Sequence, residues 1–121
     1  MYNPVHWFEI PTLDLERAKG FYQEVLQLEF QYLEMPDSKM LMFGDPEGIG
    51  SGGCLFQQDG SNPTTDGTVV YFSSEDLSVP LSRVEDAGGQ VLIPKTDIGE
   101  FGFFAHIIDS EGNKIGLHSR A

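Results

Sequence analysis

Asp109-Ser110-Glu111-Gly112 repeats the pattern of Asp45-Pro46-Glu47-Gly48 at an offset of 64 residues (109 minus 45). Asp14-Leu15 and Asp76-Leu77 each open a stretch with helical spacing of apolar residues, at an offset of 62 residues (76 minus 14). Two landmarks that recur in the same order at nearly the same spacing indicate two copies of one unit of about 60 residues. Duplicated units of this kind usually pair their sheets around a cleft, where small molecules bind. The sequence therefore predicts an α+β fold made of two βαβββ modules.

The expected elements follow the same order in both halves. In the first half we expect strands at 5–10, 28–33, 39–43 and 53–57, and a helix capped by Thr12 or Asp14, with Pro11 ending the first strand. In the second half we expect strands at 68–72, 90–93, 101–108 and 114–118, and a helix from Pro80 to about Ala87. Gly, Pro and Asn in 59–67 are typical of a connecting segment. One domain thus divides into module 1 at about 1–58, a linker at 59–66 and module 2 at about 67–121.

Composition and charge narrow the classes of partner. Seven Lys and Arg residues against nineteen Asp and Glu residues give a net charge of −12, which disfavours nucleic acid and anionic membranes. The single cysteine, Cys54, excludes an internal disulfide and favours a reducing compartment. No stretch approaches the roughly 20 apolar residues of a membrane span, and the first residues lack the pattern of a signal peptide. We expect a cytoplasmic protein.

Several segments resemble those of a known superfamily. Phe8-Glu9-Ile10-Pro11 and the helix that follows Asp14 are similar to the opening of vicinal-oxygen-chelate (VOC) proteins, which include glyoxalases, bleomycin-resistance proteins and extradiol dioxygenases. The segment from Asp109 to Ser119 resembles the end of small glyoxalase-like members. The resemblance implies that the two modules curl into an incomplete eight-stranded barrel around the site. It also implies a homodimer, the commonest symmetric assembly.

The resemblance allows a check for metal ligands. In metal-dependent members, His, Gln or Glu residues on strands facing the cavity bind one divalent ion. In this chain the matching positions fall at Val5 or Trp7, at Val69, at Gly116 and within 51–56, and none of them offers the expected donor. We therefore predict no metal cofactor. The alternative is a rearranged site of Glu9 and His118 with Cys54 or His6, which would support a lactoylglutathione lyase-like reaction, another isomerisation or a dioxygenase reaction.

Four residues remain as candidates for the site. Strand alternation places Glu9 on the face of Trp7, and His118 on the face of Gly116. A carboxylate and an imidazole can exchange protons near neutral pH, so Glu9 and His118 are candidate catalytic residues as well as ligand-binding ones. The structural alternative pairs Glu9 with Arg17, Lys114 or Arg120 and leaves His118 in solvent.

Aromatic side chains at the vacated metal positions point to a different use of the cleft. Trp7 and Tyr71 would form an apolar slot that stacks on a flat ligand, unless they only fill the core. Cys54 and His106 are interpreted as packed residues rather than as a nucleophile and a ligand. The preferred function is binding of a small organic molecule in the cleft, by a binder or by an enzyme that needs no metal. An assembly domain whose clefts are filled by side chains is the further alternative.

Overall fold

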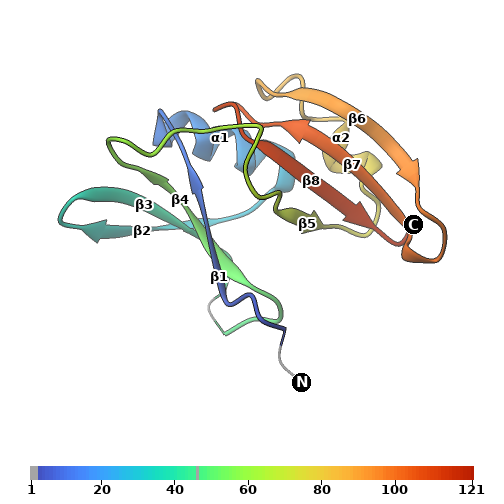
Figure 1. Cartoon of the computed structure of the whole chain (residues 1–121), viewed down its shortest axis with the longest axis horizontal. Helices are drawn as coiled ribbons and strands as arrows, with labels where there is room; N and C mark the ends of the chain where they lie inside the picture. Colours follow the sequence, from blue (N-terminus) through green and yellow to red (C-terminus); the bar gives the residue numbers. More distant parts are fainter. Residues whose placement is uncertain (1–2, 46) are drawn as a thin grey trace.

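The computed structural model describes residues 3–45 and 47–121, and these form two βαβββ modules, as the sequence predicted (Figure 1). Module 1 contains β1 (Trp7–Pro11), α1 (Leu15–Leu26), β2 (Phe30–Met35), β3 (Ser38–Phe43) and β4 (Gly52–Gln57). Module 2 contains β5 (Tyr71–Ser73), α2 (Ser78–Leu81), β6 (Gln90–Asp97), a 3-10 turn η1 (Gly99–Phe101), β7 (Phe103–Ile108) and β8 (Lys114–Ser119). None of the helices in the described chain is long and apolar enough to cross a membrane.

Each module folds into its own four-stranded mixed sheet with the same strand order. The orders are β1-β4-β3-β2 and β5-β8-β7-β6, and the first and last strands of each module pair in parallel. Among the described residues no strand ladder joins the two sheets, so the predicted curl into one incomplete barrel is not seen. Side chains make the junction instead, because the rings of Phe8 on β1 and Phe72 on β5 meet edge to face at 5.9 Å.

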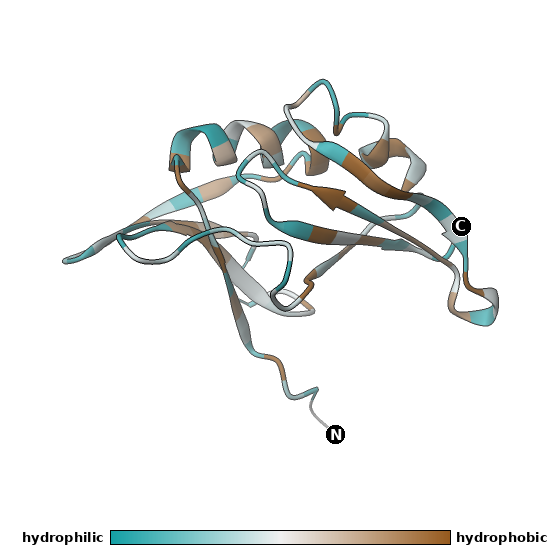
Figure 2. Cartoon of the chain, turned by 45° about the horizontal axis from the view of Figure 1, so that its top comes forward, coloured by the Kyte–Doolittle hydropathy of each residue, from teal (hydrophilic) through white to brown (hydrophobic). Residues whose placement is uncertain are grey.

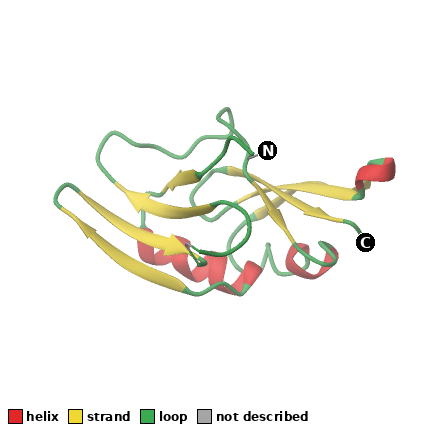
Figure 3. Ribbon diagram, turned by 90° about the horizontal axis from the view of Figure 1, so that it is seen from below, coloured by secondary structure: helices red, strands yellow, loops and turns green. Residues whose placement is uncertain are grey.

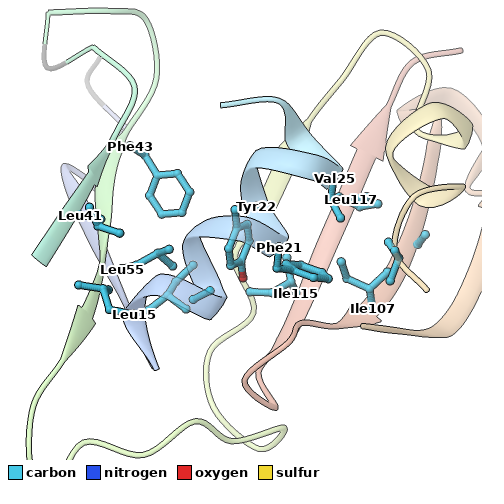
Figure 4. Close-up of a cluster of buried hydrophobic side chains, with 14 of the residues drawn as sticks. Leu15, Phe21, Tyr22, Val25, Leu41, Phe43, Leu55, Ile107, Ile115 and Leu117 are labelled. Carbon is cyan, nitrogen blue, oxygen red and sulfur yellow. The ribbon is translucent and has the colours of Figure 1, made fainter. Parts of the chain in front are cut away.

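Helix α1 fills the core of both modules. Asp14 caps it by accepting a hydrogen bond from the backbone N–H of Arg17 at 3.1 Å, which decides between the two predicted caps. Apolar and polar residues share this helix (Figure 2), and its apolar face packs against sheet residues from both modules (Figure 4). Tyr22 is fully buried, and its ring lies 5.6 Å from Phe43 and 5.9 Å from Phe72. Separating the modules would therefore expose this core to water.

The ends of several elements differ from the prediction, for local reasons. Strand β1 continues through Pro11, which was expected to stop it, because the next N–H, that of Thr12, carries the ladder on to the carbonyl of Phe56. Helix α2 has four residues and does not reach Ala87. The chain after it continues in tight turns, in which Arg83 and Val84 donate to carbonyls three residues back. Figure 3 shows α1 and α2 along the same side of the sheets.

A buried carboxylate ties module 2 to module 1. Glu111, in the turn between β7 and β8, has a fully buried side chain and accepts two hydrogen bonds from Arg17, at 2.7 and 3.0 Å. It also accepts from the N–H groups of Leu13 and Asp14 at the start of α1, at 2.9 and 2.8 Å, and from the hydroxyl of Ser110. Burial alone would raise the pKa of Glu111, but these hydrogen bonds outweigh it and the pKa is lowered.

The same turn makes a second connection between the modules. The hydroxyl of Tyr22 donates to Asp109 at 2.6 Å in a buried setting, and the side-chain amide of Asn113 donates to the carbonyl of Pro11 at 2.9 Å. Burial, followed by the nearby carboxylate of Asp109, raises the pKa of Tyr22 well above its usual value. The turn from 109 to 113 is thus an inter-module latch as well as a hairpin connection.

Candidate functional site

One side of each sheet is free of helices, and the predicted site residues lie there. Phe8, Phe72 and Leu117 point to the core, so their neighbours along the strands face the opposite way. We call this side the helix-free face. It carries Trp7, Glu9 and Cys54 in module 1, and Tyr71, Ser73, Phe104, His106, Gly116 and His118 in module 2.

Each module places an aromatic ring over a glycine on this face. Trp7 pairs with Gly52 and Tyr71 pairs with Gly116, in parallel ladders whose members are 64 residues apart (7 to 71 and 52 to 116). A Cβ at residue 52 would lie 3.4 Å from the indole ring, and a Cβ at residue 116 would collide with the phenol ring. The Tyr71 ring can therefore approach β8 this closely only because residue 116 is a glycine, whereas a Cβ at residue 52 would make an ordinary contact with the indole.

This pairing corrects the sequence-based map of the ligand positions. The register sets Tyr71, rather than Val69, beside Gly116, and of the two positions considered on the first strand it sets Trp7, not Val5, beside Gly52. Val5 and Val69 precede β1 and β5, respectively. The expected metal positions on β1, β4, β5 and β8 are thus occupied by two rings and two glycines.

A pocket opens between the first strands of the two modules, and we call it the inter-module pocket. It has a volume of about 840 Å³. Its walls include Trp7, Ile49, Val69 and Tyr71, and Asp45 is the one charged residue among the described residues that line it. Ile49 is fully exposed at the tip of the glycine-rich connection between β3 and β4. The pocket is therefore mostly apolar with an acidic rim.

Glu9 lies beside this pocket but does not line it. Its carboxylate accepts a hydrogen bond from the Trp7 indole N–H at 3.2 Å, and the Cys54 sulfur lies 3.9 Å away. The ion pair considered from the sequence is not formed, because Arg17 binds Glu111 instead. Burial, and then the negative charge of Glu9, raises the pKa of Cys54 to about 12. Cys54 is fully buried, which confirms its interpretation as a packed residue rather than a nucleophile.

His118 lies on the same face of module 2, away from Glu9. Its Nε2 is 2.6 Å from the carbonyl oxygen of Phe101, which can only accept, so Nε2 carries a proton. A second pocket of about 550 Å³ adjoins it, which we call the β5–β8 pocket. Its described lining residues are Tyr71, Ser73, Ile98, Phe101, Phe104 and His118.

The sequence missed a contact of His106. Its Nε2 is 2.6 Å from the hydroxyl of Tyr71, and burial, with Lys114 as a lesser cause, lowers its pKa. His106 pairs with Gly116 in β7–β8, and Gly116 pairs with Tyr71 in β5–β8, so all three form one row across the sheet. The hydroxyl of Tyr71 can reach the imidazole of His106 because Gly116, which lies between them, has no side chain. Alternation from Ala105 and Ile107 would have placed His106 on this face, but apolar residues on both faces obscured that signal.

The structure brings the four predicted site residues together only in part. Trp7 and Tyr71 line the inter-module pocket, while Tyr71 and His118 line the β5–β8 pocket. Glu9 lines neither, and no hydrogen bond in the described chain joins it to His118. A role for either residue in proton transfer stays a prediction.

The donors on this face do not fit a divalent ion held by three protein ligands. Within the described residues, no three His, Cys, Asp or Glu side chains converge. The thiol of Cys54, with a pKa of about 12, would bind a metal as thiolate only at a high cost in free energy. His6 is exposed ahead of β1 and His118 is hydrogen-bonded to Phe101. The rearranged set considered from the sequence is therefore not assembled.

Comparisons with known proteins agree with this fold. Residues 5–44 match the family described as "Bleomycin resistance protein-like N-terminal". The chain is 30% identical over 113 residues to "Putative glyoxylase CFP32" of Mycobacterium bovis, covering 88% of this chain but only 40% of that protein. It is 28% identical to a "Glyoxylase-like domain-containing protein" of Didymella fabae, covering 99% of this chain and 96% of that protein. The chain thus spans less than half the length of the mycobacterial relative.

Solved structures share the architecture at low identity. A glyoxalase I mutant from Zea mays superposes with a TM-score of 0.77 at 20% identity, over 97% of this chain and 46% of that one. A glyoxylase/bleomycin resistance protein/dioxygenase domain from Frankia sp. EAN1pec gives 0.75 at 19% identity, over 97% and 91% of the two chains. The internal repeat, the topology and these matches lead to one assignment. The chain belongs to the glyoxalase, bleomycin-resistance and dioxygenase (VOC) superfamily, as a glyoxylase-like member.

Proposed function

We propose that this protein binds a small organic molecule in the inter-module pocket without a divalent metal. The observation that carries the proposal is the pair of rings, Trp7 over Gly52 and Tyr71 over Gly116, at the strand positions where metal ligands were expected. Glycine at residue 116 leaves room for the phenol ring, and glycine at residue 52 places no side chain beyond the backbone against the indole. The pocket therefore has two aromatic walls at the positions where side chains that bind a metal ion were expected.

Shape and charge support a flat, largely apolar ligand. The volume of about 840 Å³ lies within the range of roughly 300–1,000 Å³ of small-molecule sites. Indole and phenol rings stack on planar ligands and gain about 0.5–1.5 kcal/mol beyond the burial of apolar area. Asp45 at the rim and the net charge of −12 disfavour an anionic ligand. The ligand class is thus a neutral or cationic aromatic molecule.

Binding is a better match than catalysis for the groups around this pocket. Asp45 is the one carboxylate among the described lining residues and lies at the rim, while the candidate base Glu9 is held by the Trp7 indole and lies outside the pocket lining. The thiol beside it, that of Cys54, is buried and protonated. We therefore favour a binding or sequestering protein over a metal-independent enzyme. We also propose a homodimer in the cytoplasm, on the basis of the superfamily resemblance and the single unpaired cysteine.

The first test is fluorescence with N-phenyl-1-naphthylamine, a neutral aromatic probe that brightens in apolar sites. Trp7 is the only tryptophan, so energy transfer from tryptophan to the probe reports on this pocket. We expect saturable transfer, and an affinity reduced about tenfold or more by Tyr71→Ala. Tyr32→Ala is the matched control, because Tyr32 is similarly exposed, at 56% against 48%, but faces Glu16 on α1. Equal loss in both variants, or no saturable transfer, would overturn the proposal.

The second test asks what the protein carries when it is purified without chelators or metal columns. Native mass spectrometry is combined with elemental analysis on the same sample. An organic adduct that Tyr71→Ala removes supports the binding proposal and identifies the ligand. One equivalent of zinc, nickel, manganese or iron, held by three protein ligands, would overturn it in favour of metal-dependent lyase, isomerase or dioxygenase chemistry.

A further inference from the structure

The β5–β8 pocket differs in chemistry from the other large surface pockets. Its six described lining residues include no Asp, Glu, Lys or Arg, although the chain has 26 such residues (19 acidic and 7 basic). Three aromatic rings and one aliphatic side chain line it, together with Ser73 and His118, which are its two available polar groups because the Tyr71 hydroxyl is already bonded to His106. Such a surface favours an uncharged, aromatic occupant.

Ser73 and His118 are neighbours, and one can donate a hydrogen bond to a ligand while the other accepts one. Ser73 and His118 are directly paired in the parallel ladder of β5 and β8, and both belong to the helix-free face. Because Nε2 of His118 donates to the Phe101 carbonyl, Nδ1 is the acceptor of the neutral imidazole. Neither Nδ1 nor the Ser73 hydroxyl has a protein partner among the described residues. One acceptor and one hydroxyl therefore stand side by side at the wall of an aromatic pocket.

We infer that the β5–β8 pocket is a second binding site, which takes a neutral phenol. The phenol O–H donates to Nδ1 of His118, the Ser73 hydroxyl donates to the phenol oxygen, and the ring packs among Phe101, Phe104 and Tyr71. The site is distinct from the inter-module pocket, since Trp7 lines only that pocket and His118 lines only this one. Tyr71 and Ser73 line both, so the two sites share a wall.

The loop over this pocket is held in place by side chains of the final residues. His118 binds the carbonyl of Phe101, and Arg120 donates to the carbonyl of Glu100 at 2.9 Å. Phe101 is nevertheless 62% exposed, and Ile98 is 38% exposed. A bound ring would cover this apolar surface without requiring the loop to form anew, which reduces the entropy cost of binding.

The experiment compares three small aromatic molecules of similar shape and follows the binding of each by the same type of NMR spectrum. p-Cresol carries the hydroxyl, toluene lacks it, and 4-methylbenzoate replaces it with a charge. In a ¹H–¹⁵N correlation spectrum, the amides of Phe101 and His118 report on the β5–β8 pocket, while the one indole N–H, that of Trp7, reports on the inter-module pocket. We expect p-cresol to shift the amide signals of Phe101 and His118. Its Kd should be roughly millimolar, because a ligand of about eight non-hydrogen atoms can gain only a few kcal/mol on binding.

Affinity differences test the two hydrogen bonds. Toluene should bind about fivefold to tenfold more weakly than p-cresol, and 4-methylbenzoate more weakly still, because no cation lines the pocket. Ser73→Ala should weaken p-cresol about threefold and leave toluene unchanged, while Ser82→Ala, on the exposed end of α2, changes neither. His118→Phe should weaken p-cresol about twofold to threefold, the share of the advantage over toluene that the bond from Ser73 does not supply. If that variant does not fold, Ser73→Ala still decides.

Three results would overturn the inference. The first is p-cresol binding no tighter than toluene. The second is p-cresol shifting only the Trp7 indole, which would place it in the inter-module pocket and leave the proposed function standing. The third is a concentration-dependent change at Phe101 without any probe, because a second copy of the chain would then cover this surface. Failure of N-phenyl-1-naphthylamine at the inter-module pocket, by contrast, would refute only the proposed function.

Discussion

Replacing Glu111 by Gln tests the inter-module latch with almost no change in shape. Glu111→Gln keeps one side-chain oxygen, which can go on accepting from the N–H groups of Leu13 and Asp14. The new amide NH₂ then faces Nε of Arg17, donor against donor, where the carboxylate accepted at 2.7 Å. The hydrogen bond from Nε, of a kind that contributes about 1.5–3 kcal/mol, is lost, and the bond from the Arg17 Nη2 to the retained oxygen keeps its geometry but loses its charged acceptor.

The magnitude is smaller than the sum of those bonds because Arg17 can regain water. Its side chain is 52% exposed whereas that of Glu111 is fully buried. The lost bond and the weakened bond, discounted by about half for this solvation, give a loss of about 1–2 kcal/mol in the free energy of unfolding. For a domain of this size, that corresponds to a Tm lower by roughly 5 °C. Urea denaturation followed by circular dichroism at pH 7 measures it.

The controls separate the latch from general effects of charge removal. Glu47→Gln is the matched control, since Glu47 holds the repeated position in module 1 but is exposed, and its change should stay within about 0.5 kcal/mol. A double-mutant cycle with Arg17→Gln should give a coupling energy of at least about 1 kcal/mol. Coupling near zero, or equal losses for Glu111→Gln and Glu47→Gln, would refute the reasoning.

The pKa of Glu111 sets the pH dependence of this stabilisation. Burial would raise that pKa, but the hydrogen bonds from Arg17, Asp14, Ser110 and Leu13 leave it below its usual value. A carboxylate with a lowered folded-state pKa stabilises the protein above its unfolded pKa of about 4.3 and stops doing so as the pH falls through the folded value. The difference between wild type and Glu111→Gln should therefore shrink below about pH 4. A difference that stays constant from pH 7 to 3 contradicts this.

Three further predictions concern single side chains. Tyr22→Phe removes a buried hydrogen bond and should lower the free energy of unfolding by about 1–3 kcal/mol; a urea melt with a loss under 0.5 kcal/mol would argue against it. Cys54 should resist a disulfide-exchange reagent at pH 8 until the protein is unfolded, because its pKa is about 12, and rapid labelling of native protein would contradict its burial. Gly116→Ala should lower the free energy of unfolding by about 1–3 kcal/mol, because the Tyr71 ring must move. Gly20→Ala should stabilise α1, since a Cβ there meets no atom within 4 Å. If thermal melts show Gly20→Ala to be the less stable of the two variants, the contact between the Tyr71 ring and Gly116 is contradicted.

The sequence was a good guide wherever the signal was local or repeated. The two Asp-x-Glu-Gly turns and the two Asp-Leu helix starts predicted both modules, and strand alternation predicted that Trp7 and Glu9 share a face. The length of α2 was overestimated because Val84 and Ala87 continue helical spacing, while the backbone after Leu81 turns with a mixture of hydrogen bonds to carbonyls three and four residues back. Local spacing does not distinguish these two backbone paths.

Contacts that span the chain were beyond the reach of sequence patterns. Arg17 and Glu111 are 94 residues apart, and nothing near either residue indicates the pairing. The link between Tyr71 and His106 depends on how β5 and β7 are aligned along β8. Alternation of side chains shows which face each residue is on, but a strand shifted by two residues keeps the same faces, so alternation does not fix this alignment. The ligand position on β5 was likewise assigned two residues too early, because it was placed ahead of the Tyr71-Phe72 pair and not from the pairing with β8.

The two repeated turns have different roles in the structure. In module 2, Glu111 is buried against module 1, so its neighbours are constrained by the folding of the whole chain. In module 1, the bonds of Asp45 within the described chain are local, from the N–H groups of Glu47 and Gly48, and residues 48–52 border the inter-module pocket. One copy can therefore vary freely while the other preserves the fold. Libraries that randomise residues 47–51 should yield new ligand specificities at little cost in expression.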